Sequence, residues 1–187
     1  MSWLITPDRS KCLAFIPRCG STAFGRAMLV RYYPELVERL TKCHKPPGGK
    51  AAPPQLVCPS VGAPPEDAER FALIRDPIER FRSGLNRISR KRNIPADEAI
   101  AALRGNRGRY DVHVRSQYLF IAGVERVKLY RFPEGIAACA AAMGLPVPPQ
   151  ENESPAGAKP SLTAAQESAL RDIYQDDFAL FAAASSS

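Results

Sequence analysis

Short apolar runs alternate along this chain with segments in which apolar residues recur every three or four positions. The runs at 11–16, 70–74 and 127–132 have the length and composition of buried β-strands. Strands that alternate with helices predict an α/β fold, in which helices cover both faces of a parallel sheet.

A helix is expected after each of these strands. Residues 21–33 contain good helix formers with few breakers. A second helix begins at Asp76, which can act as its N-cap, with Pro77 in the first position and Glu79 completing a capping-box-like pair. Further helices are predicted from Pro34, over 95–103, over 133–143 and from Thr163, where Gln166 completes a capping box.

The length of 187 residues predicts a single domain over 1–187, with room for one core. Residues 43–65 contain seven prolines and three glycines, which predicts a long loop or lid. A second Pro- and Gly-rich loop is expected over 146–160, and a frayed tail over 182–187.

The net charge of +7 predicts an anionic partner: a nucleic acid, a membrane surface, a polyanionic saccharide or a phosphorylated cofactor. No apolar run approaches the roughly 20 residues that span a bilayer, and the first residues lack the layout of a signal peptide. Five cysteines, odd in number and without a C-x-x-C pair, favour neither a disulfide scaffold nor a zinc site. We therefore expect a cytoplasmic protein without a membrane span.

The turn from the first strand into the first helix has the chemistry of an anion site. The amides from Gly20 to Phe24 have no intrahelical acceptor, and the helix dipole favours negative charge beside them. Gly20 allows close approach of the backbone, Ser21 and Thr22 add hydroxyl donors, and Arg18 adds a full positive charge. An ordinary strand–helix connection with an exposed arginine would have the same sequence.

Two better-known phosphate loops do not fit this turn. A Walker loop requires G-x-x-x-x-G-K-[ST], and no lysine follows a glycine in that frame. Six residues separate Cys19 from Arg26, one more than a cysteine-phosphatase loop allows. Nucleotide hydrolysis is therefore disfavoured, and Cys19 is interpreted as a small turn residue rather than a nucleophile.

A second candidate anion site follows the strand at 70–74. Arg75 stands at the carboxyl end of this strand, where parallel sheets hold their ligands. Ser83 lies about two turns into the next helix, off the apolar stripe, and can face the same cleft. An arginine fork with a serine hydroxyl suits a terminal phosphate, although a solvated basic helix face is the commoner explanation.

Together, the two segments resemble the cofactor motifs of a known enzyme family. Ile-Pro-Arg-Cys-Gly-Ser-Thr (16–22) and Arg-Asp-Pro-x-x-Arg-x-x-Ser-x-x-x-Arg (75–87) are similar to the motifs of sulfotransferases that use 3′-phosphoadenosine 5′-phosphosulfate (PAPS). The likeness is closest to the carbohydrate-type branch and its bacterial relatives, and residues 173–181 resemble the closing helix of such proteins. It implies a P-loop-like three-layer sandwich with a small central parallel sheet flanked by helices.

The resemblance also implies roles for individual residues. Arg75 and Ser83 would bind the 3′-phosphate. The 5′-phosphosulfate loop would consist of Arg18, Cys19, Gly20, Ser21, Thr22 and Ala23. The family usually has lysine at the position of Arg18; arginine keeps the charge but cannot donate a proton to the leaving group.

Sulfuryl transfer to a hydroxyl is an in-line displacement that needs charge neutralisation, positioning and usually a base, but no metal. His44 is the first choice of base because many relatives carry theirs at this place. His113 is the second, since its surroundings resemble a His-x-x-Pro-Gln stretch in which Ser116 replaces the proline. A structural role for either histidine stays open, and Glu35 or Asp111 could serve if burial raised its pKa.

These features predict a cytoplasmic sulfotransferase that moves a sulfuryl group from PAPS to a hydroxyl, or less often an amine, of a saccharide or small-molecule acceptor. The product would be adenosine 3′,5′-bisphosphate (PAP). We expect residues 43–65 and 104–117 to line the acceptor pocket, and the sequence indicates neither the acceptor nor an oligomeric state.

Two alternatives remain. One is a P-loop nucleotide kinase-like phosphotransferase that uses ATP and Mg²⁺, although the chain lacks its lysine signature and an obvious magnesium carboxylate. The other, ranked third, is a basic nucleic-acid-binding module that uses Lys42, Lys45, Arg87, Arg90, Lys91 and Arg92.

Overall fold

The computed structural model describes residues 3–34, 57–58, 64–106, 109–148 and 159–186. Its strands are β1 (Trp3–Ile5), β2 (Lys11–Ala14), β3 (Val57–Cys58), β4 (Glu69–Arg75) and β5 (Val127–Phe132). Its helices are α1 (Ser21–Tyr32), α2 (Pro77–Arg92), α3 (Ala96–Gly105), α4 (Ile136–Met143), α5 (Ala164–Ile173) and α6 (Gln175–Ala183), with a short 3₁₀ helix η2 (Tyr118–Phe120). The predicted α/β class is confirmed.

The strands form one sheet in the order β3-β1-β2-β4-β5. Strands β2, β4 and β5 are parallel, as predicted, but β1 is antiparallel to both β2 and β3. The expectation of a purely parallel sheet is therefore wrong. Residues 6–10, which connect β1 to β2, are too few for a crossover and can only form a hairpin.

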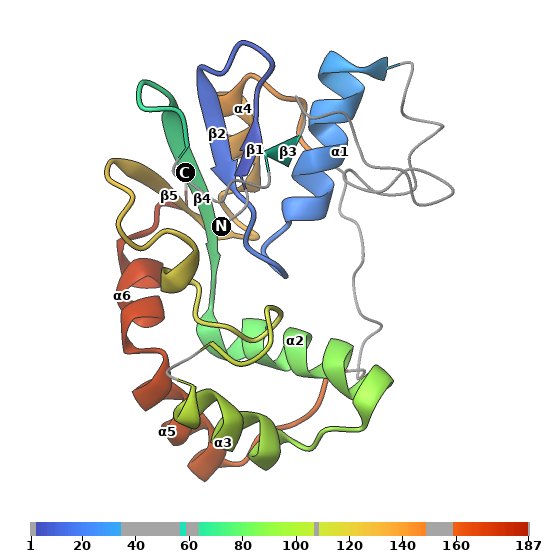
Figure 1. Cartoon of the computed structure of the whole chain (residues 1–187), viewed down its shortest axis with the longest axis vertical. Helices are drawn as coiled ribbons and strands as arrows, with labels where there is room; N and C mark the ends of the chain where they lie inside the picture. Colours follow the sequence, from blue (N-terminus) through green and yellow to red (C-terminus); the bar gives the residue numbers. More distant parts are fainter. Residues whose placement is uncertain (1–2, 35–56, 59–63, 107–108, 149–158, 187) are drawn as a thin grey trace.

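Apolar side chains gather in two clusters. Helices α2, α3 and α5 lie apart from the sheet, beyond the carboxyl end of β4 (Figure 1). The first cluster surrounds the sheet, and it includes Phe24 of α1, Phe71 of β4 and Cys139 of α4. The second lies among α2, α3, α5 and α6. The apolar stripe predicted for α2 belongs to this second cluster, where Ile78, Phe81, Leu85 and Ile88 are all buried. The segment between β4 and α2 therefore joins the two cores.

The helix starts follow the predicted caps. The Asp76 carboxylate accepts a hydrogen bond from the Glu79 N–H at 2.9 Å, and Pro77 occupies the first turn. The Glu79 side chain, however, does not close the box, because it binds Arg82 at 2.8 Å and Lys159 at 2.7 Å. The last predicted helix has its complete capping box at its start, but it divides at Tyr174 into α5 and α6.

A frayed tail was expected over 182–187, but residues 182–185 are bound to the rest of the protein. Helix α6 continues to Ala183, and Ala184 is buried. Ser185 then pairs with β5: its N–H donates to the Leu129 carbonyl at 3.0 Å, and its carbonyl accepts from the Arg131 N–H at 2.7 Å. Strand β5 is at the edge of the sheet and leaves backbone groups that the tail can bind.

Several predicted features lie outside the described residues. These are most of the 43–65 loop, the helix expected from Pro34, and residues 149–158 of the second loop. None of the helices that the structure describes is long and apolar enough to cross a bilayer.

Candidate functional site

The sheet topology brings the two predicted anion sites together. Strands β2 and β4 are parallel neighbours, with Leu13 opposite Phe71, so their carboxyl ends lie at the same edge of the sheet. The loop that leads from β2 to α1 and the junction of β4 with α2 therefore face each other. This is the edge at which open α/β sheets hold their ligands.

The loop from β2 to α1 turns through two residues with left-handed backbone. Arg18 has a φ of 72° and Gly20 a φ of 77°. Arginine seldom adopts this conformation, which costs roughly 1–3 kcal/mol. Gly20 is suited to it, and a Cβ there would lie 3.0 Å from the Phe132 ring. The Ser21 hydroxyl donates to the Ile16 carbonyl and so closes the loop instead of facing a ligand.

Three of the predicted site residues are in direct contact. The Arg18 guanidinium donates from Nε at 2.9 Å and from NH2 at 2.7 Å to the hydroxyl oxygen of Ser83, which is 65 residues away in sequence. The Arg75 guanidinium donates to the Arg18 carbonyl at 3.2 Å and lies over the Phe132 ring. Thr22 and Ala23 are half-buried in the first turn of α1.

Positive charges are crowded at this edge of the sheet. Burial is the main reason that the pKa of the Arg18 guanidinium lies below its usual value. The charges of Arg75, Arg87 and Arg80 lower this pKa further. Because like charges destabilise one another, an anion bound among them would be favoured.

Arg80 connects the two loops from inside the protein. Its side chain is almost fully buried and donates to the Pro17 carbonyl at 3.0 Å and to the Arg115 carbonyl at 2.5 Å. A third, longer contact of 3.5 Å reaches the Val112 carbonyl. The guanidinium thus fixes residues 112–115 beside the β2–α1 loop.

Gln117 is a buried residue of the site that the sequence did not single out. Its amide donates to the Arg75 carbonyl at 2.9 Å and accepts from the Arg75 N–H at 3.0 Å. The same amide oxygen accepts from the Cys19 thiol at 3.1 Å. Burial raises the pKa of this thiol, so Cys19 stays protonated, as the interpretation of a turn residue requires.

Asp177 of α6 is the second buried residue that the sequence did not reveal. Its carboxylate accepts hydrogen bonds from the Ser116 hydroxyl at 2.6 Å, the Gln117 N–H at 2.8 Å and the Tyr118 N–H at 2.9 Å. A signal was present: Asp177 follows Tyr174 by three residues and so lies on the apolar face of its helix.

His113, one of the two candidate bases, pairs with Asp111. Its ring Nδ1 lies 2.8 Å from Asp111 Oδ1, which also accepts the His113 backbone N–H at 2.9 Å. A Cβ at Gly84 would lie 2.3 Å from the His113 carbonyl oxygen, so this segment packs directly on α2 beside Ser83. The other candidate, His44, and the alternative Glu35 lie outside the described residues.

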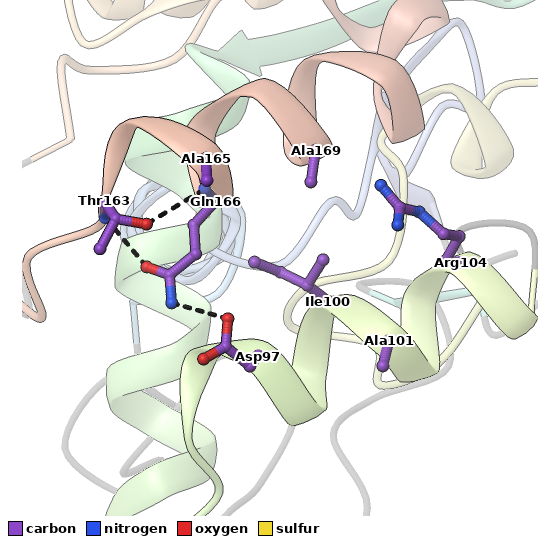
Figure 2. Close-up of a pocket in the computed structure, with 8 residues that line it drawn as sticks. All are labelled: Asp97, Ile100, Ala101, Arg104, Thr163, Ala165, Gln166 and Ala169. Carbon is purple, nitrogen blue, oxygen red and sulfur yellow. Dashed lines mark hydrogen bonds between the residues drawn. The ribbon is translucent and has the colours of Figure 1, made fainter.

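A separate shallow groove runs between α3 and α5 (Figure 2). Its lining residues are Asp97, Ile100, Ala101, Arg104, Thr163, Ala165, Gln166 and Ala169. The Gln166 amide donates to Asp97 at 2.8 Å across it. Of the regions expected to line an acceptor pocket, it includes only Arg104.

The fold and the site define an α/β protein with a cationic site at the carboxyl ends of two adjacent parallel strands. Among the described residues, no three His, Cys, Asp or Glu side chains are grouped so as to hold a metal ion. Comparisons with models of known families, with curated proteins and with solved structures found no match.

Proposed function

We propose that this chain is a PAPS-dependent sulfotransferase of P-loop-like architecture, acting in the cytoplasm on a hydroxyl or amine of a saccharide or small-molecule acceptor. The observation that carries the proposal is the contact of Arg18 with Ser83 and of Arg75 with Arg18, in front of the α1 N-terminus. Two motifs with separate anion-binding chemistry converge there at one edge of the sheet.

The residues of this edge suit a ligand with two anionic ends. Arg75 and Ser83 would hold the 3′-phosphate; Ser83 accepts from Arg18 and keeps its own hydroxyl proton to donate. Residues 18–23 would hold the 5′-phosphosulfate through Arg18 and the first amides of α1. When bound, PAPS supplies the sulfuryl group and a stable bisphosphate leaving group.

The remaining chemistry belongs to side chains of this protein. Arg18 would offset negative charge that develops on the leaving phosphate, in a partly buried setting where the charge acts strongly. His113 would take the acceptor proton, because its backbone packs against Gly84, the residue next to Ser83 in α2. His44 stays a prediction for the same role.

Ligand-dependent thermal stability tests the cofactor site. We expect PAP to raise the Tm of the protein more than adenosine 5′-monophosphate does, because only PAP carries the 3′-phosphate. Arg75→Ala and the milder Arg75→Lys should lose most of this difference, measured against the Tm of each variant without ligand. Arg104→Ala removes the same charge from the exposed end of α3 and should keep it.

The outcome that contradicts the proposal is equal stabilisation by both nucleotides, or a full PAP effect in Arg75→Ala. Transfer of labelled sulfate from PAPS across a panel of hydroxyl and amine acceptors then tests the reaction. His113→Ala should abolish transfer and keep the PAP effect; loss of transfer in His44→Ala alone would assign the base to His44.

A further inference from the structure

We propose that Asp111 is a positioning residue that holds His113 in the tautomer that a general base needs. The inference rests on the proposed function for its chemistry, and on the geometry of the Asp111–His113 pair for its structural part. Asp111 itself would touch neither the acceptor nor the nucleotide; it would act only through the imidazole.

The hydrogen bond to Asp111 sets the tautomer of the His113 ring. An ionised carboxylate only accepts hydrogen bonds, so the hydrogen shared over the 2.8 Å between Asp111 Oδ1 and His113 Nδ1 belongs to the ring. Neutral His113 then carries its lone pair on Nε2. In the described part of the chain, Nε2 has no hydrogen-bond partner, so this nitrogen is available to accept a proton.

Burial, hydrogen bonds and a nearby arginine together set the charge of Asp111. Burial acts to raise the pKa of this carboxyl, but hydrogen bonds from the His113 N–H and ring outweigh it. The positive charge of Arg92, whose NH1 lies 4.0 Å from Asp111 Oδ2, lowers the pKa further. Asp111 is therefore ionised at neutral pH and can stabilise a protonated ring.

Backbone contacts with α2 hold the Asp111–His113 pair in position. The segment that carries it packs on α2, because Gly84 leaves room for the His113 carbonyl and Arg80 binds the Val112 and Arg115 carbonyls on either side. Gly84 adjoins Ser83, which binds Arg18. Among the described residues, the charge of Arg92 acts on Asp111, and Arg80 binds the backbone of the same segment.

In the reaction, the acceptor oxygen forms a bond to sulfur while the bond from sulfur to the phosphate oxygen of PAPS breaks. His113 Nε2 takes the hydroxyl proton, and Asp111 holds the resulting imidazolium by its Nδ1–H. PAP leaves with the electron pair of the broken bond, and the proton passes from His113 to water afterwards.

Nitrogen NMR of the imidazole rings tests the pair without any ligand. The chain has two histidines, so His44→Gln assigns the spectrum. We expect neutral His113 in the Nδ1–H form, and Asp111→Asn to shift it toward the Nε2–H form common in a free histidine side chain. The matched control Asp172→Asn changes an exposed carboxylate on α5 and should leave the spectrum unaltered. An Nε2–H form in the unmodified protein overturns the inference. So does a tautomer that Asp111→Asn leaves unchanged.

The kinetic arm separates positioning from a structural role. Asp111→Asn should lower kcat by about 10- to 100-fold, a part of what a general base contributes. KM for PAPS and the Tm effect of PAP should stay unchanged, and Asp111→Glu should restore part of the rate. An unchanged kcat in Asp111→Asn contradicts the inference, whereas a lack of PAP binding in the unmodified protein contradicts the proposed function and leaves the NMR result standing.

Discussion

A single carboxylate, Asp177, organises the segment that supplies Gln117 to the site. Burying a charge is costly unless hydrogen bonds replace its water shell. Here three donors from residues 116–118 replace it, and one of them is the backbone N–H of Gln117. The side-chain amide of Gln117 in turn binds the backbone of Arg75. The closing helix α6 thus contributes to the site through one residue that faces inward.

We expect Asp177→Asn to lower the free energy of unfolding by about 2–3 kcal/mol, since hydrogen bonds to a charged group contribute most. An asparagine amide would also direct an N–H group at a donor. Urea denaturation measures the change, with Asp176→Asn on the exposed side of the same turn as control, for which about 0.5 kcal/mol or less is expected. Equal effects of the two variants would show that the buried carboxylate has no special role.

Helix α2 is the element that joins core and site. One face buries Phe81 and Leu85 in the second apolar cluster. Another carries Arg80 and Ser83 toward the β2–α1 loop. Between these faces, Gly84 admits the backbone of the segment around His113. Because α2 packs against three parts of the protein, we expect substitutions at these contacts to destabilise the fold.

Gly84→Ala tests this contact at the scale of the element. The new Cβ would lie 2.3 Å from the His113 carbonyl oxygen, a backbone atom, so the segment must shift. We expect a loss of about 1–3 kcal/mol in unfolding free energy, as for other overpacked sites. Gly105→Ala, in α3 with open space around it, should instead stabilise by about 0.4–1 kcal/mol. A neutral Gly84→Ala variant would contradict the close packing of α2 on this segment.

At the scale of the whole molecule, the sheet depends on the end of the chain. Ala184 packs in the first apolar cluster. Ser185 pairs with β5 at Tyr130, in addition to the pairing of β5 with β4. The outer edge of β5 is thereby partly covered, which protects its backbone groups from solvent and from other strands.

Removal of residues 184–187 should therefore destabilise the protein by about 1–3 kcal/mol, from two lost backbone hydrogen bonds and the lost packing of the Ala184 side chain. The Arg131 amide, which donates to the Ser185 carbonyl, should exchange its hydrogen faster in this variant. Removal of 186–187 alone keeps the pairing and is the control. Unchanged exchange at Arg131 would show that the tail does not protect β5.

Local patterns predicted most of the elements. The strand from Lys11 and the strand at 127–132 were found from their apolar runs, and the start of α2 from Asp76 and Pro77. Strand β1 was not predicted, because three residues are too few for a periodic signal. The break at Tyr174 was also missed, since the apolar stripe continues across it.

The sequence by itself determined the chemistry of the two loops and the helices that begin at them. Apolar periodicity, caps and turn residues act over a few positions, so the neighbouring letters contain them. Only the tertiary structure decided that Arg18 meets Ser83, that β1 runs antiparallel and that Gln117 and Asp177 are buried. These contacts join residues far apart in the chain, and they depend on how the two apolar clusters pack rather than on any local preference.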